Sequence, residues 1–416
     1  MRKKLFILSM ICVVVIGITS LVFCLSHILE KKESKNKKNE IVDKTFSTRF
    51  IKESHKNIDD VNYMISPYSV ELALSMLKDG ATGKTFDEIE SAVPKRNIKY
   101  LGINNKLNIA NAVFVNNLYK DYVSGEYLNN IKNNYNADLI YDDFITPNAI
   151  NDWVDRKTYG MIKDLVSDVD PSSVLSLVNA VAMEEKWLDS FECDNTFKKE
   201  FTSLNNEKYD VSMMSETFNS NVSYYKDENA DIVIIPYKKY DVEGNEVNDS
   251  GEQLEFIGIL PKNIDKYINS INIDAIRKIE NEKEEASSEL LIHVELPKYI
   301  SSYDFKDFKK TLNNMGIKRV FNDSESELKK VVNTDKNAYV GDAIHKTYIS
   351  VDESGTKAAA VTHFNTQTSS AVPEKKDRVD IIFDKPFIYM IKDVNSDEIL
   401  FFGVMSKPND YVEPIC

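Results

Sequence analysis

Residue types that build metal centres and redox sites are scarce in this 416-residue chain. It has four cysteines, and no two of them form a Cys-x-x-Cys pair. Its five histidines include no two that lie one helical turn apart in the sequence. We therefore expect neither a zinc centre nor a thioredoxin-type redox pair, and we predict no metal and no other cofactor.

Basic residues are in the minority as well. Lys and Arg together number 52 against 66 Asp and Glu, so the formal net charge is −14. Because residues 1–40 carry a net charge of +5, the remaining residues carry −19. A protein that binds nucleic acid neutralises phosphates with an excess of Lys and Arg. The acidic body therefore argues against nucleic acid as a partner.

Motifs of common enzymes are missing too. The chain contains no Gly-x-Ser-x-Gly, the signature of many serine hydrolases. Gly83-Lys84-Thr85 is similar to the end of a phosphate-binding loop, but Lys78 stands where that motif needs its first glycine. We interpret this stretch as a connection between two helices, and we do not expect the chain to be an enzyme.

The N-terminus has the composition of a membrane-targeting segment. Three basic residues precede an uncharged stretch of 25 residues from Leu5 to Leu29, which is long enough to span a bilayer as a helix. We expect a membrane anchor or signal segment over residues 1–29 and a charged linker over 30–44. An uncleaved anchor, a signal cleaved after Ser20 and a lipid anchor on Cys24 are the three alternatives. They predict a membrane-anchored protein with an extracellular body, or a secreted one.

Two cysteines lie outside the apolar stretch, Cys193 and Cys416. We predict two free thiols there, while a bridge between them stays open as the alternative.

The body of the chain reads as one large α+β domain. Ser66 followed by Pro67 indicates the start of a helix. Apolar residues then lie on nearly all faces of this helix, so it should be buried. Thr85 and Glu88 predict a capping box for a second helix, and residues 149–166 predict another helix that is interrupted near Gly160. Later segments have the composition of strands: 174–181, 232–236, 254–261, 290–296, 379–383, 387–391 and 399–404.

Residues 353–373 connect two predicted strands and contain mostly small and β-branched side chains. A connection of this length in a compact domain is either functional or disordered. As an added strand, it would place Thr356, Ala358, Ala360 and Thr362 on one face, where small side chains can lie against a core. Composition alone favours a flexible linker over such a strand.

A series of short motifs runs through the body of the chain. They are Ile65-Ser66-Pro67-Tyr68-Ser69 with Gly80-Ala81, Leu177-Val178-Asn179-Ala180 with Lys186-Trp187, Leu296-Pro297-Lys298-Tyr299, Met315-Gly316, His345-Lys346, Val351-Asp352-Glu353-Ser354-Gly355-Thr356-Lys357-Ala358-Ala359-Ala360, and Phe383-Asp384-Lys385-Pro386-Phe387. In this order and spacing they resemble the serpin family. The resemblance covers about residues 45–408 and leaves a C-terminal tail, 409–416.

The resemblance implies a single large domain with helices, three β-sheets and an exposed reactive loop at about 353–378. It implies a monomeric inhibitor that traps a serine protease, or a cysteine protease, when the cleaved loop inserts into the central sheet. A non-inhibitory serpin-fold binding protein at the cell surface is the alternative. Partners are then a target protease and, through the N-terminal segment, the membrane.

The resemblance also assigns residues to roles. The loop hinge comprises Glu353, Gly355, Thr356, Ala358, Ala359 and Ala360. A polar network that controls opening of the sheet comprises Ser66, Ser69, Asn179 and His345, with Trp187 beneath the point of loop entry. In the intact loop we expect Thr356 to be exposed or at the edge of the sheet. Two departures from the family pattern are Glu184-Glu185, where Lys-Gly is usual, and Lys357, where Glu is usual.

The spacing from the hinge that is usual in the family places the reactive bond between Ser369 and Ser370. Alternatives are one of Thr368, Ser370 and Ala371, or a basic residue among Lys375, Lys376 and Arg378. A small residue before the bond suits the shallow specificity pocket of an elastase-like or subtilisin-like protease.

Overall fold

The computed structural model describes residues 45–416, apart from Asp60, Ile415 and the segments 94–106, 241–245, 248–253, 335–336 and 357–376. The expected membrane segment and its linker lie outside this range, as do Ala358, Ala359, Ala360, Ser369 and Ser370. Across the described residues, no helix is both long and apolar enough to cross a membrane. Thr45–Cys416 forms one unit, which is described below.

The central sheet is built around β4 (Leu175–Met183), which is buried on both faces. The strands of this sheet lie in the order β12 (Tyr299–Asp304), β13 (Val340–Asp352), β4, β2 (Leu107–Asn116) and β3 (Asp138–Asp142). The short β14 (Gly355–Thr356) pairs with β13. β13 and β4 are parallel to each other, whereas β2 and β4 are antiparallel. The mainly apolar run at 174–181, which contains only Ser176 and Asn179 as polar residues, is explained by this double burial.

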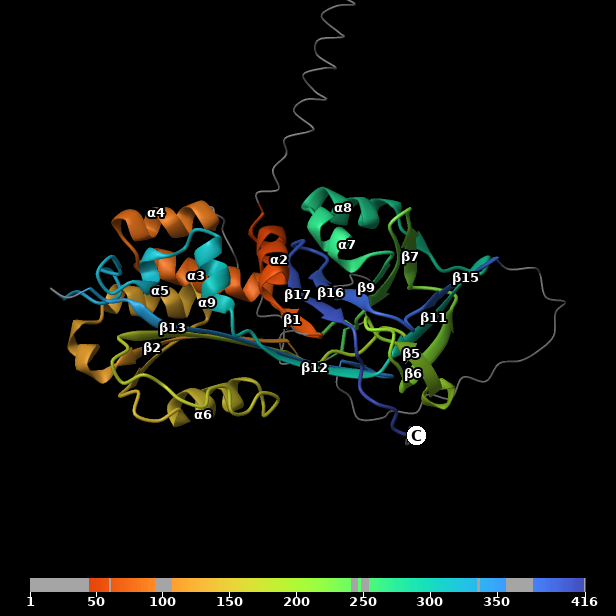
Figure 1. Cartoon of the computed structure of the whole chain (residues 1–416), viewed down its shortest axis with the longest axis horizontal. Coiled ribbons are helices and arrows are strands. Elements are labelled where there is room, and N and C mark those ends of the chain that lie inside the picture. Colours follow the sequence, from red (N-terminus) through yellow and green to blue (C-terminus); the bar gives the residue numbers. More distant parts are fainter. Residues whose placement is uncertain are drawn as a thin grey trace, which may run out of the picture. The chain divides into compact units, whose positions relative to one another are not determined.

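Successive residues of β4 point into two different cores. Leu177 and Val181 face the larger core, while Val178 and Ala180 face a smaller one with Trp153. In Figure 1, α6 lies on one face of the sheet and α3, α5 and α9 lie on the other. α3 is buried along nearly its whole length, as its sequence predicts.

Two further sheets complete the α+β fold. The seven-stranded sheet has the order β1 (Tyr63–Ile65), β17 (Ile399–Met405), β16 (Phe387–Asp393), β9 (Leu254–Pro261), β8 (Ala230–Pro236), β7 (Ser223–Lys226) and β10 (Glu284–Glu285). The four-stranded sheet has the order β15 (Asp377–Ile382), β11 (Leu290–Pro297), β6 (Lys208–Phe218) and β5 (Phe197–Thr202). Every strand expected from the sequence corresponds to an observed one, and the predicted fold class is confirmed.

The helices of the described residues surround these sheets. They are α2 (Phe46–Asn57), α3 (Pro67–Gly80), α4 (Gly83–Ala92), α5 (Gly125–Tyr135), α6 (Asn148–Lys157), α7 (Ile264–Ser270), α8 (Ile273–Glu282) and α9 (Phe308–Asn314), with the 3₁₀ turns η1 (Asn117–Tyr122), η2 (Cys193–Asn195) and η3 (Arg319–Phe321).

Two local predictions need correction. The helix expected over 149–166 is interrupted near Gly160 as predicted, because Tyr159 and Gly160 take positive φ values of 50° and 79°, but it ends at Lys157 and no helix resumes up to residue 166. The capping box of Thr85 and Glu88 does not form. Instead, the carboxylate of Glu327 accepts hydrogen bonds from the backbone N–H of Lys84 at 2.7 Å and of Thr85 at 3.4 Å. This carboxylate occupies the N-terminus of α4, which agrees with a helix–helix connection at Gly83-Lys84-Thr85.

One glycine of the seven-stranded sheet is needed for close packing. Gly403 of β17 lies opposite Tyr389 of β16, and a Cβ atom at position 403 would stand 2.2 Å from the tyrosine ring. We therefore expect Gly403→Ala to lower the free energy of unfolding by about 1–3 kcal/mol, because a buried ring must move. Gly125→Ala is the control, since no heavy atom lies within 4 Å of its added Cβ. Urea unfolding of both variants measures the difference, and equal midpoints would contradict the packing argument.

Candidate functional site

The chain reverses direction where β13 ends and runs back between β13 and the segment that follows β4. The boundary along which β13 pairs with β4 is called the seam below. The ladder between these parallel strands runs from the Val340–Leu175 pair to the Tyr348–Ala182 pair. Beyond it the turn at Glu353 and Ser354 brings β14 back alongside β13. Thr356 pairs with Val351 on one side, and Gly355 forms an antiparallel bridge with Lys186 on the other. β14 therefore already lies between the two sides of the seam, just beyond the end of the β13–β4 ladder.

Thr356 is fully buried, which corrects the expectation that it is exposed or at an edge. Its backbone N–H donates to the carbonyl of Glu185 at 2.5 Å, and its hydroxyl lies 3.1 Å from the hydroxyl of Tyr237. Burial raises the pKa of Tyr237, so that this hydroxyl stays protonated. Thr356 is enclosed because β13 and the segment after β4 already stand apart at this level.

Gly355 is required by the backbone at this turn. Its φ of +147° lies in a region that residues with a Cβ rarely adopt. An added Cβ would also meet the carbonyl oxygen of Glu185 at 2.2 Å. The contact uses the backbone of Glu185, so the departure from the family's Lys-Gly pair at this place leaves it intact.

Trp187 supports the turn from below. It is fully buried and stacks on Tyr237 with ring centroids 4.6 Å apart. Its indole N–H donates to the carbonyl of Asp352, and its backbone N–H donates to that of Ser354, each at 3.0 Å. Both hydrogen bonds reach the turn that carries the hinge, so Trp187 contacts the hinge directly.

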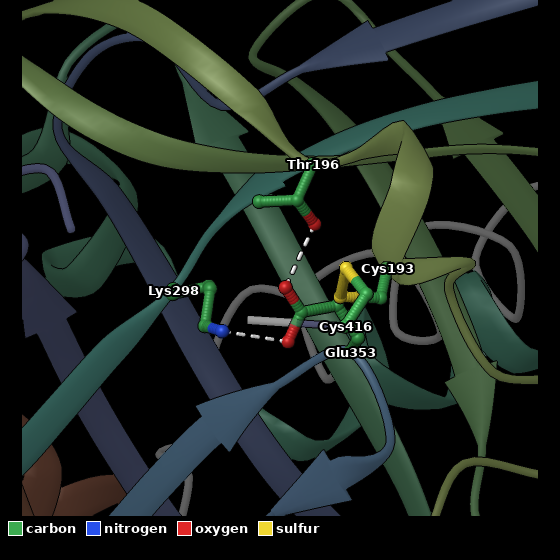
Figure 2. The surroundings of a disulfide bond; sticks show 5 residues. All are labelled: Cys193, Thr196, Lys298, Glu353 and Cys416. Carbon is green, nitrogen blue, oxygen red and sulfur yellow. Dashed lines mark hydrogen bonds and ion pairs between the residues drawn. A yellow bond between two sulfur atoms is a disulfide. The ribbon is translucent and has the colours of Figure 1, made fainter. Parts of the chain in front are cut away.

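Glu353 anchors the other side of the turn. Its carboxylate accepts from the hydroxyl of Thr196 at 2.8 Å and from the ammonium of Lys298 at 2.7 Å. Its carbonyl accepts from the backbone N–H of Phe191 at 2.9 Å. Figure 2 shows the two side-chain contacts next to the Cys193–Cys416 disulfide. The turn is thus held by residues from two separate segments.

The disulfide corrects the prediction of two free thiols. Cys193 in η2 and Cys416 at the end of the tail are bonded, with their Cα atoms 5.9 Å apart. The bond joins positions separated by 223 residues. It brings the C-terminal tail to the segment that holds Glu353.

The structure brings together, beneath the central sheet, the four residues predicted to form the polar network: Ser66, Ser69, Asn179 and His345. His345 of β13 and Asn179 of β4 are register partners, and the imidazole Nδ1 lies 2.5 Å from the amide Oδ1. The hydroxyl of Ser69 donates to the same oxygen at 2.9 Å, and the backbone N–H of Ser66 donates to Nε2 of His345 at 3.0 Å. The amide nitrogen of Asn179 donates to Asn111 Oδ1 at 2.7 Å.

These contacts fix the tautomer of His345. Because the backbone N–H of Ser66 can only donate, Nε2 must be the unprotonated acceptor, and Nδ1 therefore carries the proton that is donated to Asn179. A second proton on Nε2 would face the N–H of Ser66. Complete burial lowers the pKa of His345 to about 3, so the neutral ring is the stable form.

Sequence reasoning missed several members of this site. Asn111 lies in a strand whose alternation gives no hint of a buried amide partner. Thr196 and Lys298 acquire their roles through contacts with Glu353, which lies far away in the sequence. No group of three or more His, Cys, Asp or Glu side chains within the described ranges could hold a metal ion.

The buried His345 makes stability depend on pH in a defined window. The unfolded chain protonates this residue near its ordinary pKa of about 6.5, whereas the folded chain does so only near 3. Between these values the unfolded state binds more protons, so the contribution is fully present above pH 6.5 and declines as the pH falls. From pH 7 to pH 5 we expect His345 to cost about 2 kcal/mol of unfolding free energy.

Urea unfolding at pH 7, 6 and 5 measures this loss. It should vanish in His345→Gln and persist in the control His293→Gln, whose ring lies on β11. An equal loss in His345→Gln and the unmodified chain would show that another group causes the acid sensitivity.

Comparisons with known proteins agree with this geometry. A family model described as Serpin (serine protease inhibitor) matches residues 42–408. A serpin-like protein of Thermococcus kodakarensis is 30% identical over 84% of this chain and 81% of its own length. The leukocyte elastase inhibitor of Xenopus laevis is 28% identical over 87% of this chain and 97% of its own. The native state of the thermophilic serpin tengpin superimposes with a TM-score of 0.73 at 29% identity, over 87% of this chain and 93% of that one. The chain therefore belongs to the serpin family of protease inhibitors.

Proposed function

We propose that this serpin is a suicide-substrate inhibitor of a serine protease. The protease serine attacks the carbonyl carbon before the cleaved bond, an ester forms, and the amine of the next residue leaves. The freed loop then inserts into the central sheet, as is known for serpin loops, and carries the esterified protease with it before water hydrolyses the ester.

The position of β14 is the observation that carries this proposal. β14 runs antiparallel to β13 and bridges in antiparallel fashion to the segment after β4. Further residues that followed it would replace one parallel ladder by two antiparallel ones, which are somewhat more stable per residue. Each added hydrogen bond contributes about 1 kcal/mol. Insertion therefore has a thermodynamic driving force and a defined starting point.

The residues after Thr356 suit such a strand. Alternation from the buried Thr356 places Ala358, Ala360 and Thr362 on the same face, and none of them is bulky or charged. From Thr356 to Ser369 there are 14 residues, which extend to at most roughly 50 Å. This length is sufficient to carry the protease away from the hinge.

The polar network would control how easily the seam opens. His345 and Asn179 face each other across the seam at 2.5 Å, and an added strand needs about 4.8 Å on each side. Their hydrogen bond must therefore break during insertion. A buried polar group that loses its partner costs about 1–3 kcal/mol, which adds to the barrier that keeps the intact protein in its native form.

Two features support a target and a compartment. A small residue before the reactive bond suits an elastase-like or subtilisin-like protease, and relatives from several vertebrates are named leukocyte elastase inhibitors. A disulfide persists in oxidising surroundings, and residues 1–29 have the composition of a membrane anchor or a signal segment. We therefore place the body of the protein outside the cytoplasm, either anchored or secreted.

A gel experiment tests the proposal directly. Incubation with an elastase-like or subtilisin-like protease should give a covalent complex that survives reducing, denaturing electrophoresis, and the released fragment should begin at Ser370. Trypsin should cut near Lys375 without being trapped. A covalent trypsin complex whose fragment begins after a basic residue would show that the reactive bond lies elsewhere.

Variants of the hinge test insertion itself. Thr356→Arg is unsuitable, because Thr356 is buried in the intact protein. Ala358→Arg places a guanidinium on the same face two residues later, where insertion must bury it unpaired. A barrier raised by roughly 3 kcal/mol slows insertion more than about a hundredfold, so the ester hydrolyses first and the protease leaves active.

The measurement is the number of inhibitor molecules consumed per protease molecule silenced. We expect this ratio to rise at least about tenfold in Ala358→Arg. The control Lys357→Ala, on the opposite face of the inserted strand, should stay close to the unmodified chain. If all three ratios are equal, insertion at the hinge is not the mechanism, and a binding protein at the cell surface becomes the better interpretation.

A further inference from the structure

We propose that the Cys193–Cys416 disulfide is a redox-controlled latch on the opening of the central sheet. In the oxidised protein it would restrain the seam between β13 and β4, and reduction would release that restraint. This inference rests on the proposed inhibitory function, in which insertion requires the seam to open. It concerns a segment that the family model does not include, since the match ends at residue 408.

The C-terminal tail is fixed on two sheets before it reaches Cys193. The side-chain oxygen of Asn409 accepts from the backbone N–H of Ile300 in β12 at 2.6 Å. The backbone N–H of Tyr411 donates to the carbonyl of Asp210 in β6 at 2.9 Å. Val412 exchanges two hydrogen bonds with the hydroxyl of Ser212 in β6, at 2.8 and 3.0 Å. The tail is therefore a tether whose far end is fixed to the body of the protein.

The disulfide ties this tail to Cys193, which lies in the segment after β4 that must move when the seam opens. Cys193 lies ten residues after Met183, the last residue of β4. Within those ten residues, Glu185 and Trp187 bind the hinge, and Phe191 binds the carbonyl of Glu353. When β4 moves away from β13 to admit a strand, this connection is displaced with it. A covalent bond from Cys193 to the anchored tail opposes that displacement.

The same bond steadies the anchor of the turn. Thr196, which donates to the carboxylate of Glu353, lies three residues after Cys193, and its backbone N–H donates to the carbonyl of Cys193 at 2.9 Å. Figure 2 places this hydroxyl, the Glu353 carboxylate and the disulfide next to one another. A tethered Cys193 thus keeps Thr196 in position to hold Glu353. Without the tether, Lys298 remains as the other side-chain partner of that carboxylate.

The latch is accessible to a reductant. Cys416 is exposed and Cys193 is only half-buried. A dithiol reductant opens the bond by exchange: one thiolate attacks a sulfur of the disulfide, the second thiol resolves the mixed disulfide, and the reductant leaves as its own cyclic disulfide. Two electrons and two protons pass to the protein, which then carries two cysteine thiols. An inhibitor that reaches a reducing compartment would thereby lose the restraint on its seam.

Hydrogen exchange resolved by residue tests this inference. The oxidised protein, the protein reduced with dithiothreitol, and the variant Cys416→Ser are compared at neutral pH. We expect backbone amides along the seam, from Ile344 to Tyr348 in β13, to exchange at least about tenfold faster in the reduced protein and in Cys416→Ser. Amides of β16 in the seven-stranded sheet serve as the internal reference and should change much less. Dithiothreitol should have no further effect on Cys416→Ser.

Two results would overturn the latch. Equal exchange rates in all samples would mean that the disulfide does not restrain the seam, and equal acceleration in β13 and β16 would mean that it only stabilises the whole fold. Trapping of a protease by the oxidised protein and by the reduced protein is measured in parallel. A protein that traps the protease but shows either of those exchange results keeps the proposed function and loses the latch. A protein that traps none in either redox state loses the proposed function itself.

Discussion

The contact on which the rest of this molecule depends is the parallel ladder between β13 and β4. Each strand of this pair belongs to a different part of the central sheet, because β12 lies beyond β13 and β2 and β3 lie beyond β4. The connection after β13 does not leave the sheet but folds back into its upper end as β14. The seam is therefore closed along its ladder and already holds a short strand at one end. Its lower part is held by backbone hydrogen bonds and by the amide and imidazole groups beneath it.

Those polar groups hold the seam in a way that apolar packing would not. A purely apolar interface at this depth would be held by contacts that change gradually as two strands separate. The hydrogen bond between His345 and Asn179 is instead directional, and it is lost over a small displacement. Asn111 and Ser69 supply alternative partners from neighbouring elements, so the amide of Asn179 stays paired on one side as the other side opens. The network therefore gives the seam a threshold.

Local sequence patterns predicted the parts of this site that depend on one segment at a time. Ser66-Pro67 and the apolar residues after it indicated a buried helix, and the composition of residues 174–181 indicated a strand. The motifs that resemble serpins predicted that Asn179 and His345 would meet, although they stand 166 positions apart. What could not be predicted depends on distances between segments. Whether Cys193 reaches Cys416, and whether the space beside Val351 admits Thr356, follow from how the tail and the segment after β4 are placed. No pattern within either segment encodes that placement.

The disulfide has a further consequence once the loop has been cut. β15, β16 and β17 all follow the reactive loop, so a single cleavage leaves them on a separate piece of chain. In the folded molecule they stay in place through their pairing with β11 and β9. Cys416 belongs to this same piece and is bonded to Cys193 on the other one. The two pieces of a cleaved molecule are consequently one covalent entity, and even complete unfolding cannot separate them until the sulfur–sulfur bond is reduced.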